Sequence, residues 1–111
     1  MKNSYLGIVV ARKGSKGIKN KNFLLVNKKK NKRIIDYTLL AAKRSIKLNS
    51  ILLTSNDERI LKVAKKYDLD MIVKRRSSLS KDNSKTVDAV IDALNRFTKK
   101  FYKPENIVLL Q

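Results

Sequence analysis

A basic, glycine-containing segment holds the side chains of this chain that are best suited to chemistry. Residues 11–22 directly follow an apolar run at 5–10, and they contain two of the three glycines, one serine and five Lys or Arg side chains. Backbone N–H groups and cationic heads converge in this way where a polyphosphate must be held. A plain surface turn is the alternative. The segment matches neither common phosphate motif, because Gly14 and Gly17 are too close for a Walker A loop and Arg12 stands where a dinucleotide fingerprint needs glycine.

Apolar runs alternate with amphipathic stretches, and this alternation predicts the elements that position the basic segment. Strands are expected at 4–10, 51–55, 71–73 and 107–110, with a brief one near 23–26 and a turn at 28–33. Helices are expected at 34–48, from an N-cap at Asn56 or Asp57 to about Tyr67, and at 86–97. The inward side chains of the last helix would be Val87, Val90, Ile91, Leu94 and Phe97, and both Tyr67 and Phe97 are expected in the core.

This order of elements predicts an α/β fold, a Rossmann-like, mostly parallel sheet with helices on both faces. Ligands of such sheets bind beyond the carboxyl ends of the strands. The basic segment, residues 54–57, Arg75 and Gln111 all follow predicted strands, so they are expected on one rim.

Composition narrows the classes of function. The 111 residues carry a net charge of +18 and no Cys or His, which excludes disulfides, thiolate metal sites and the commonest general base. The cations are spread along the chain, and the one true run, 28–33, has no interleaved aromatic residue for base stacking. A lysine-rich surface is therefore favoured over the two alternatives, nucleic-acid binding and an acidic partner protein. No run is apolar enough to cross a membrane and no signal peptide is evident, so the expected location is the cytoplasm.

The order of residues in the basic segment resembles a known family. Ala-Arg-x-Gly-Ser-Lys-Gly-Ile-x-x-Lys-Asn, at residues 11–22, is similar to the N-terminal signature of the acylneuraminate cytidylyltransferases. Residues 35–38, 53–60, 75–86 and 109–111 resemble later segments of the same family. The resemblance implies a fold of the nucleotide-diphospho-sugar transferase type, truncated here. Residues 1–111 would form a single N-terminal CTP-binding part of the cytidylyltransferase domain.

The resemblance also implies a reaction and a set of site residues. The family joins CTP to an acidic nine-carbon sugar of the sialic acid type and releases pyrophosphate. Arg12 and Lys21 would be the catalytic residues and would bind the triphosphate, and Asn22 would read the cytosine edge. Further nucleotide or substrate contacts would come from Ser15, Lys16, Arg75, Ser84, Thr86 and Gln111, the last one near the acidic sugar.

The chain departs from the family pattern in two residues and in length. Lys13 replaces the usual glycine and Val10 a frequent proline. The family implies Mg²⁺, but its metal-binding aspartates lie further on, so no metal ligand is assigned within this chain. A homo-oligomer or a complementing chain is therefore expected as a partner. Alternatives are a non-catalytic nucleotide-binding fragment, a subunit that needs a partner chain, and, less favoured, a basic nucleic-acid-binding protein.

Overall fold

The computed structural model describes residues 4–11, 25–75 and 86–110. Its main sheet has four strands in the order β5-β4-β1-β6, and every neighbouring pair is parallel. The strands are β1 (Tyr5–Val10), β4 (Ser50–Ser55), β5 (Met71–Lys74) and β6 (Asn106–Leu110). The predicted α/β class with a parallel sheet is confirmed.

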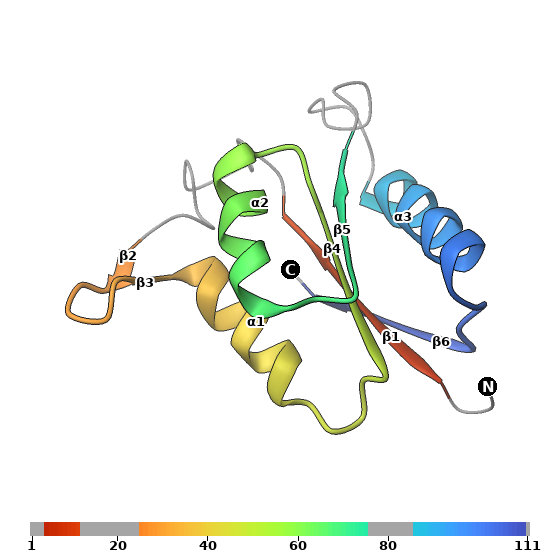
Figure 1. Ribbon diagram of the computed structural model, residues 1–111, viewed down its shortest axis with the longest axis horizontal. Helices are drawn as coiled ribbons and strands as arrows, with labels where there is room; N and C mark the ends of the chain where they lie inside the picture. The colour runs from red at the N-terminus through yellow and green to blue at the C-terminus, as the bar shows by residue number, and fades with distance from the viewer. Residues whose placement is uncertain (1–3, 12–24, 76–85, 111) are drawn as a thin grey trace.

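Helices cover both faces of this sheet (Figure 1). One face is covered by α1 (Ile34–Arg44) and α2 (Glu58–Ala64), and α2 continues into a 3-10 turn at Lys65–Tyr67. The other face is covered by α3 (Thr86–Lys100). None of the described helices combines the length and the apolar character needed to cross a bilayer.

The two-sided burial explains why the strands read as continuous apolar runs. Successive side chains of a strand point to opposite faces. In β1, Leu6 and Ile8 pack toward α3, whereas Val9 packs toward α1 and α2. Leu52 and Leu53 of the neighbouring β4 divide in the same way, and both are fully buried. Two small cores, one on each face, therefore hold the sheet in place.

Two helix predictions need correction. The first helix was expected to reach residue 48, but α1 ends at Arg44 because Ser45 has extended backbone angles. Ile46, whose spacing fits the apolar face of the expected helix, lies beyond its end and is 97% exposed. In α3, the buried row is Ala89, Ala93 and Phe97, whereas Val87 and Ile91 are half exposed.

The row of alanines explains the error in α3. Each helical residue turns by about 100°, so Val87 and Ile91, each two positions from Ala89, lie on nearly the opposite side of the helix from it. Small side chains let the helix approach the sheet closely, and the sheet therefore meets the alanine row rather than the bulkier one. Phe97 is buried as predicted.

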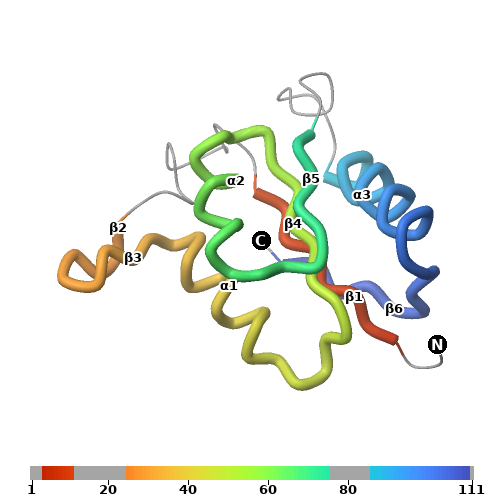
Figure 2. Tube along the Cα trace, viewed as in Figure 1, coloured from red at the N-terminus to blue at the C-terminus, as the bar shows by residue number. Residues whose placement is uncertain are grey.

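A short hairpin projects from the body of the protein, at the far left of Figure 2. It consists of β2 (Leu25–Asn27) and β3 (Lys32–Arg33), joined by the predicted turn. Asn27 Oδ1 accepts a hydrogen bond from the backbone N–H of Lys30 at 3.1 Å. Asn31 adopts a left-handed conformation with φ of 52°, which asparagine tolerates better than most residues. The lysine run thus forms a structured turn.

Strand β6 forms one edge of the described sheet, and it is incompletely covered on both faces. Ile107 and Leu109 are 41% and 45% exposed. Beside the other face runs a mainly apolar groove of about 270 Å³, lined by residues that include Tyr5, Leu48, Val108 and Leu110. We call this strand and its two apolar flanks the β6 edge.

Candidate active site at the carboxyl rim

The described part of the rim is built where β1, β4 and β5 end. The backbone N–H of Ala11 donates to the carbonyl oxygen of Thr54 at 3.1 Å, and that of Arg75 donates to the carbonyl oxygen of Ser55 at 2.8 Å. These bonds continue the parallel ladder past the strands. The connections that leave β1, β4 and β5 therefore start side by side, as sequence reasoning predicted for this edge.

The connection between β4 and α2 is held by Asp57. Asp57 Oδ1 accepts from the backbone N–H of Arg59 at 2.9 Å, which confirms the predicted N-cap, and the N–H of Asp57 donates to Ser55 Oγ at 3.0 Å. The guanidinium of Arg59 also lies 2.9 Å from Asp57 Oδ2. The hydrogen bond to Asp57 raises the pKa of Arg59. Asp57 therefore acts as a structural residue of the rim.

A second described carboxylate at this edge is paired as well. Glu58 Oε1 lies 2.5 Å from Lys74 Nζ, and both side chains are about 70% exposed. Within residues 4–11, 25–75 and 86–110 there is no group of three or more Asp or Glu side chains that could hold a metal ion. Mg²⁺ needs carboxylates that are free to coordinate it. Asp57 and Glu58 are already engaged by cations, so these two carboxylates are not free to form a Mg²⁺ site.

Two predicted site residues fall within the described part, and both lie on the α3 side of the rim. Arg75 directly follows β5 and is only 5% exposed. It falls on the same face of the sheet as Val73, which packs toward α3. Thr86 is the first residue of α3 and is exposed. A charged side chain this deeply buried is uncommon for a plain surface cation.

One buried hydroxyl on this side was not singled out from the sequence. Thr54 is fully buried, and its Oγ1 has no hydrogen-bond partner among the described residues. Alternation along β4 gives it the same face as Leu52, toward α3. The available signal was its position at the start of the polar stretch 54–57, which follows an apolar run. Threonine is also common within strands, so this position alone did not indicate a functional residue.

The remaining predicted site residues lie outside the described residues. They are Arg12, Ser15, Lys16, Lys21, Asn22, Ser84 and Gln111. Their positions are adjacent in sequence to described rim residues: Arg12 follows Ala11, and Gln111 follows the end of β6. Their roles stay predictions.

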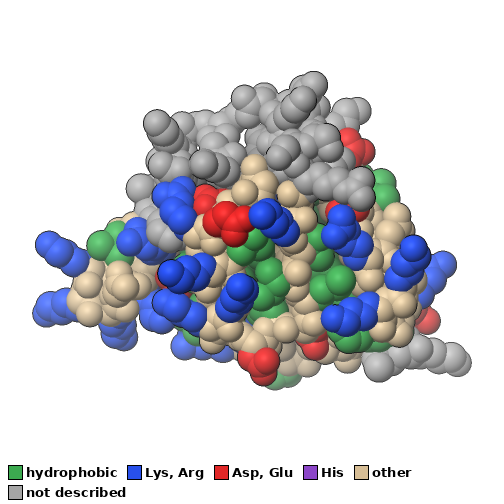
Figure 3. All heavy atoms as spheres, turned by 45° about the horizontal axis from the view of Figure 1, so that its top comes forward, with side chains coloured by type: hydrophobic (Ala, Val, Ile, Leu, Met, Phe, Trp, Pro, Cys, Tyr) green, Lys and Arg blue, Asp and Glu red, His purple; other side chains and the backbone are tan. Residues whose placement is uncertain are grey.

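Lys and Arg side chains are spread over the visible face rather than gathered in one patch (Figure 3). This view turns the upper edge of Figure 1 toward the reader, and acidic side chains are few in it. The dispersed pattern agrees with the interpretation of the high charge as a property of the surface.

A parallel sheet with helices on both faces and polar connections at one rim defines a protein of the open α/β class. The family profile described as Cytidylyltransferase matches residues 6–103, and the chain belongs to this family.

Three curated relatives are similar to this chain. A CMP-N,N'-diacetyllegionaminic acid synthase of Campylobacter jejuni is 33% identical over 84% of this chain and 38% of its own length. One of Legionella pneumophila is 30% identical over 96% of this chain and 44% of its own. An N-acylneuraminate cytidylyltransferase of Escherichia coli is 30% identical over the whole chain and 25% of its own length. The chain thus spans between a quarter and less than half of these relatives.

Proposed function

We propose that this chain is the nucleotide-binding part of a cytidylyltransferase that activates an acidic nine-carbon sugar with CTP. The observation that carries the proposal is the family match over residues 6–103, which includes the basic segment and the strands whose ends form the rim. In the proposed reaction a sugar hydroxyl oxygen bonds to the α-phosphorus of CTP. The bond from that phosphorus to the bridging oxygen breaks, and pyrophosphate leaves.

The proposed work of this chain is to hold and align the nucleotide. Alignment and neutralisation of charge supply most of the rate enhancement in phosphoryl-type transfer. Arg12, Lys16 and Lys21 would bind the triphosphate together with Ser15, and Asn22 would pair with the cytosine. Arg75 would add a second cation from the opposite side of β4, while Ser84, Thr86 and Gln111 would contact nucleotide or sugar.

We propose a nonulosonic acid as the acceptor, because the relatives are named for N-acylneuraminate and for N,N'-diacetyllegionaminic acid. Mg²⁺, which the resemblance implies, has no fitting carboxylate set in the described residues, so the mechanism is written without it. The cytoplasm is the proposed location, because it is where CTP is available.

Calorimetric titration of the chain with CTP, against ATP, GTP and UTP, tests the nucleotide assignment. We expect CTP to bind at least tenfold more tightly than the other three. Arg12→Gln should weaken CTP binding, whereas Lys99→Gln, on the exposed last turn of α3, should not. Equal affinity for all four nucleotides would contradict the proposal. We also expect the 111-residue chain alone to make little CMP-sugar, and robust synthesis would contradict that part.

A second candidate function is a nucleotide-binding subunit that is completed by more polypeptide. The half-exposed apolar side chains on both faces of the β6 edge favour it, because edge strands with apolar flanks readily pair with another chain. Sedimentation equilibrium of the chain and of an Ile107→Lys/Leu109→Lys variant tests this idea. Self-association that the variant abolishes supports it, with Ile46→Lys as the control on an exposed loop. A monomer at every concentration contradicts self-pairing.

A further inference from the structure

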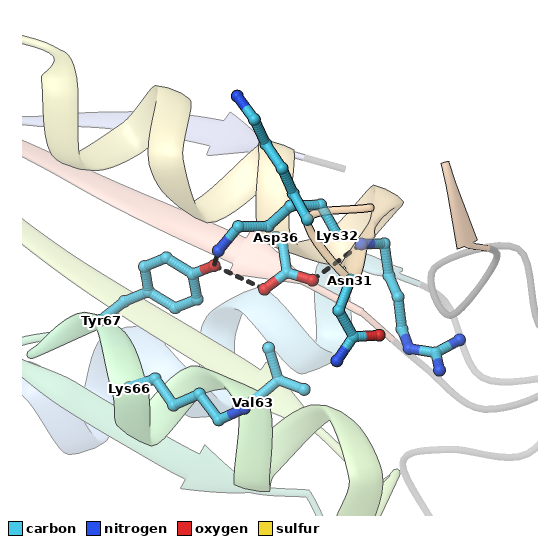
Figure 4. Close-up of a pocket in the computed structure, with 8 residues that line it drawn as sticks. Asn31, Lys32, Asp36, Val63, Lys66 and Tyr67 are labelled. Carbon is cyan, nitrogen blue, oxygen red and sulfur yellow. Dashed lines mark hydrogen bonds between the residues drawn. The ribbon is translucent and has the colours of Figure 1, made fainter. Parts of the chain in front are cut away.

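A second hollow lies between the hairpin, the first turn of α1 and the end of α2 (Figure 4). Its volume is about 410 Å³, and none of the described rim residues named above lines it. Asn31 of the hairpin turn and Val63 and Lys66 from the α2 end face the hollow from opposite sides. The neutral part of the wall is thus an amide, an aliphatic side chain and the ring of Tyr67. We call this hollow the hairpin pocket.

The lining of the hairpin pocket is strongly positive. Among the described residues, it contains one carboxylate, Asp36, against four cations, an excess of three positive charges: Lys30, Lys32, Arg33 and Lys66. Lys30 and Lys66 are exposed, and neither has an ion-pair partner in the described part of the chain. Their charges are therefore available to an incoming anion.

The single carboxylate is already satisfied by the protein. Asp36 is 6% exposed, and its two oxygens accept hydrogen bonds from the hydroxyl of Tyr67 at 2.5 Å and from the backbone N–H of Arg33 at 2.8 Å. Burial, with the hydrogen bond to Asp36, raises the pKa of Tyr67 to about 12, so its hydroxyl stays a neutral donor. These two hydrogen bonds offset part of the negative charge of Asp36 and so reduce the repulsion that it would exert on an anion.

The same network fixes one of the cations. Lys32 Nζ lies 3.5 Å from the hydroxyl of Tyr67 and 5.8 Å from the centre of its ring. The lysine is thereby held above the pocket wall rather than extended into solvent. Lys32 is held in place and Lys30 and Lys66 have no ion-pair partner among the described residues, so the three cations can contact an anion from several directions.

We propose that the hairpin pocket binds a small oxyanion of the phosphate class with two or more negative charges. Three excess cations neutralise such a group without burying a net charge, and the amide of Asn31 can donate to one of its oxygens. A tetrahedral oxyanion accepts hydrogen bonds in several directions, which suits cations that come from a turn and from a helix end. The hollow is large enough for more than one phosphate group. Neither Arg75 nor Thr86, the described residues of the proposed nucleotide site, lines this pocket.

Titration of ¹⁵N-labelled chain with inorganic phosphate, and separately with pyrophosphate, at constant ionic strength tests the proposal. We expect saturating amide shifts at Val63, Lys66 and Tyr67. The double variant Lys30→Gln/Lys66→Gln should raise the dissociation constant for phosphate at least fivefold. Lys29→Gln/Lys62→Gln, which removes the same charge from exposed positions of the same turn and helix outside the pocket, should change it less than twofold.

The outcomes separate the possible explanations. Shifts that never saturate, or equal weakening in both double variants, would overturn the proposal and attribute binding to the overall charge of +18. Tighter binding of pyrophosphate than of phosphate would assign two phosphate positions to the pocket, and equal binding would assign one. Arg75→Gln, which is aimed at the rim, should leave the phosphate-induced shifts at Val63, Lys66 and Tyr67 unchanged. Failure of the CTP assignment can thereby be told apart from failure of this one.

Discussion

Replacement of Arg75 by glutamine is the most direct test of the rim with a residue whose position is described. The side chain is 5% exposed at the end of β5, so its charge lies in a medium of lower dielectric than bulk water. Hydrogen bonds between charged groups contribute about 1.5–3 kcal/mol. Since about 1.4 kcal/mol corresponds to a factor of ten, Arg75→Gln should weaken CTP binding about 10- to 150-fold.

The neighbouring Lys74 supplies the control for this experiment. Lys74→Gln removes the same charge one residue earlier, from a side chain that is 70% exposed and paired with Glu58. Its effect on the CTP dissociation constant should stay below twofold, because exposed ion pairs are weak. Arg75→Lys keeps the charge but loses the planar fork, so an intermediate loss is expected. Calorimetry gives the affinities, and circular dichroism verifies that each variant is folded. Equal CTP affinities in the Arg75→Gln and Lys74→Gln variants would refute the reasoning.

Three further predictions concern stability. Asp57→Ala should cost about 0.5–2 kcal/mol in urea unfolding through loss of the α2 N-cap, and Asp57→Ser should recover most of it; equal losses would show that the cap is not the cause. The pKa of Tyr67 is raised to about 12 in the folded chain, so the unfolded chain ionises first and stability should fall between pH 10 and about 12. Urea midpoints in this range should fall less steeply for Tyr67→Phe, and identical slopes would contradict this. Phe97→Ala should cost about 3–5 kcal/mol in thermal unfolding, and a loss no larger than that of the half-exposed Phe101→Ala would be inconsistent with its buried position.

The architecture was open to sequence reasoning because the relevant signals are local. A strand buried on both faces must be apolar throughout, and residues 5–10 and 51–53 form such apolar runs. The N-cap at Asp57 needs only a carboxylate before a helical pattern, and the turn at 28–31 needs only polar residues between two short strands. The basic segment was found through its composition and its resemblance to one family.

Packing decided what local pattern could not. The apolar arc of α3 is wider than the strip that the sheet covers, and the choice of Ala89 and Ala93 over Val87 and Ile91 depends on how closely the helix approaches its neighbours. The end of α1 at Arg44 leaves Ile46 in solvent although its spacing fits the helical stripe.

The sequence by itself determined the α/β class, the order of the elements and the rim at which the polar connections meet, because each follows from periodicity and from the parallel connection of strands. Only the tertiary structure decided that Arg75 is buried on the α3 side of the sheet, that Lys74 holds Glu58, and that Asp36 meets Tyr67 across 31 positions of the chain. Contacts between segments far apart in sequence depend on how helices dock on the sheet, and no local pattern encodes that docking.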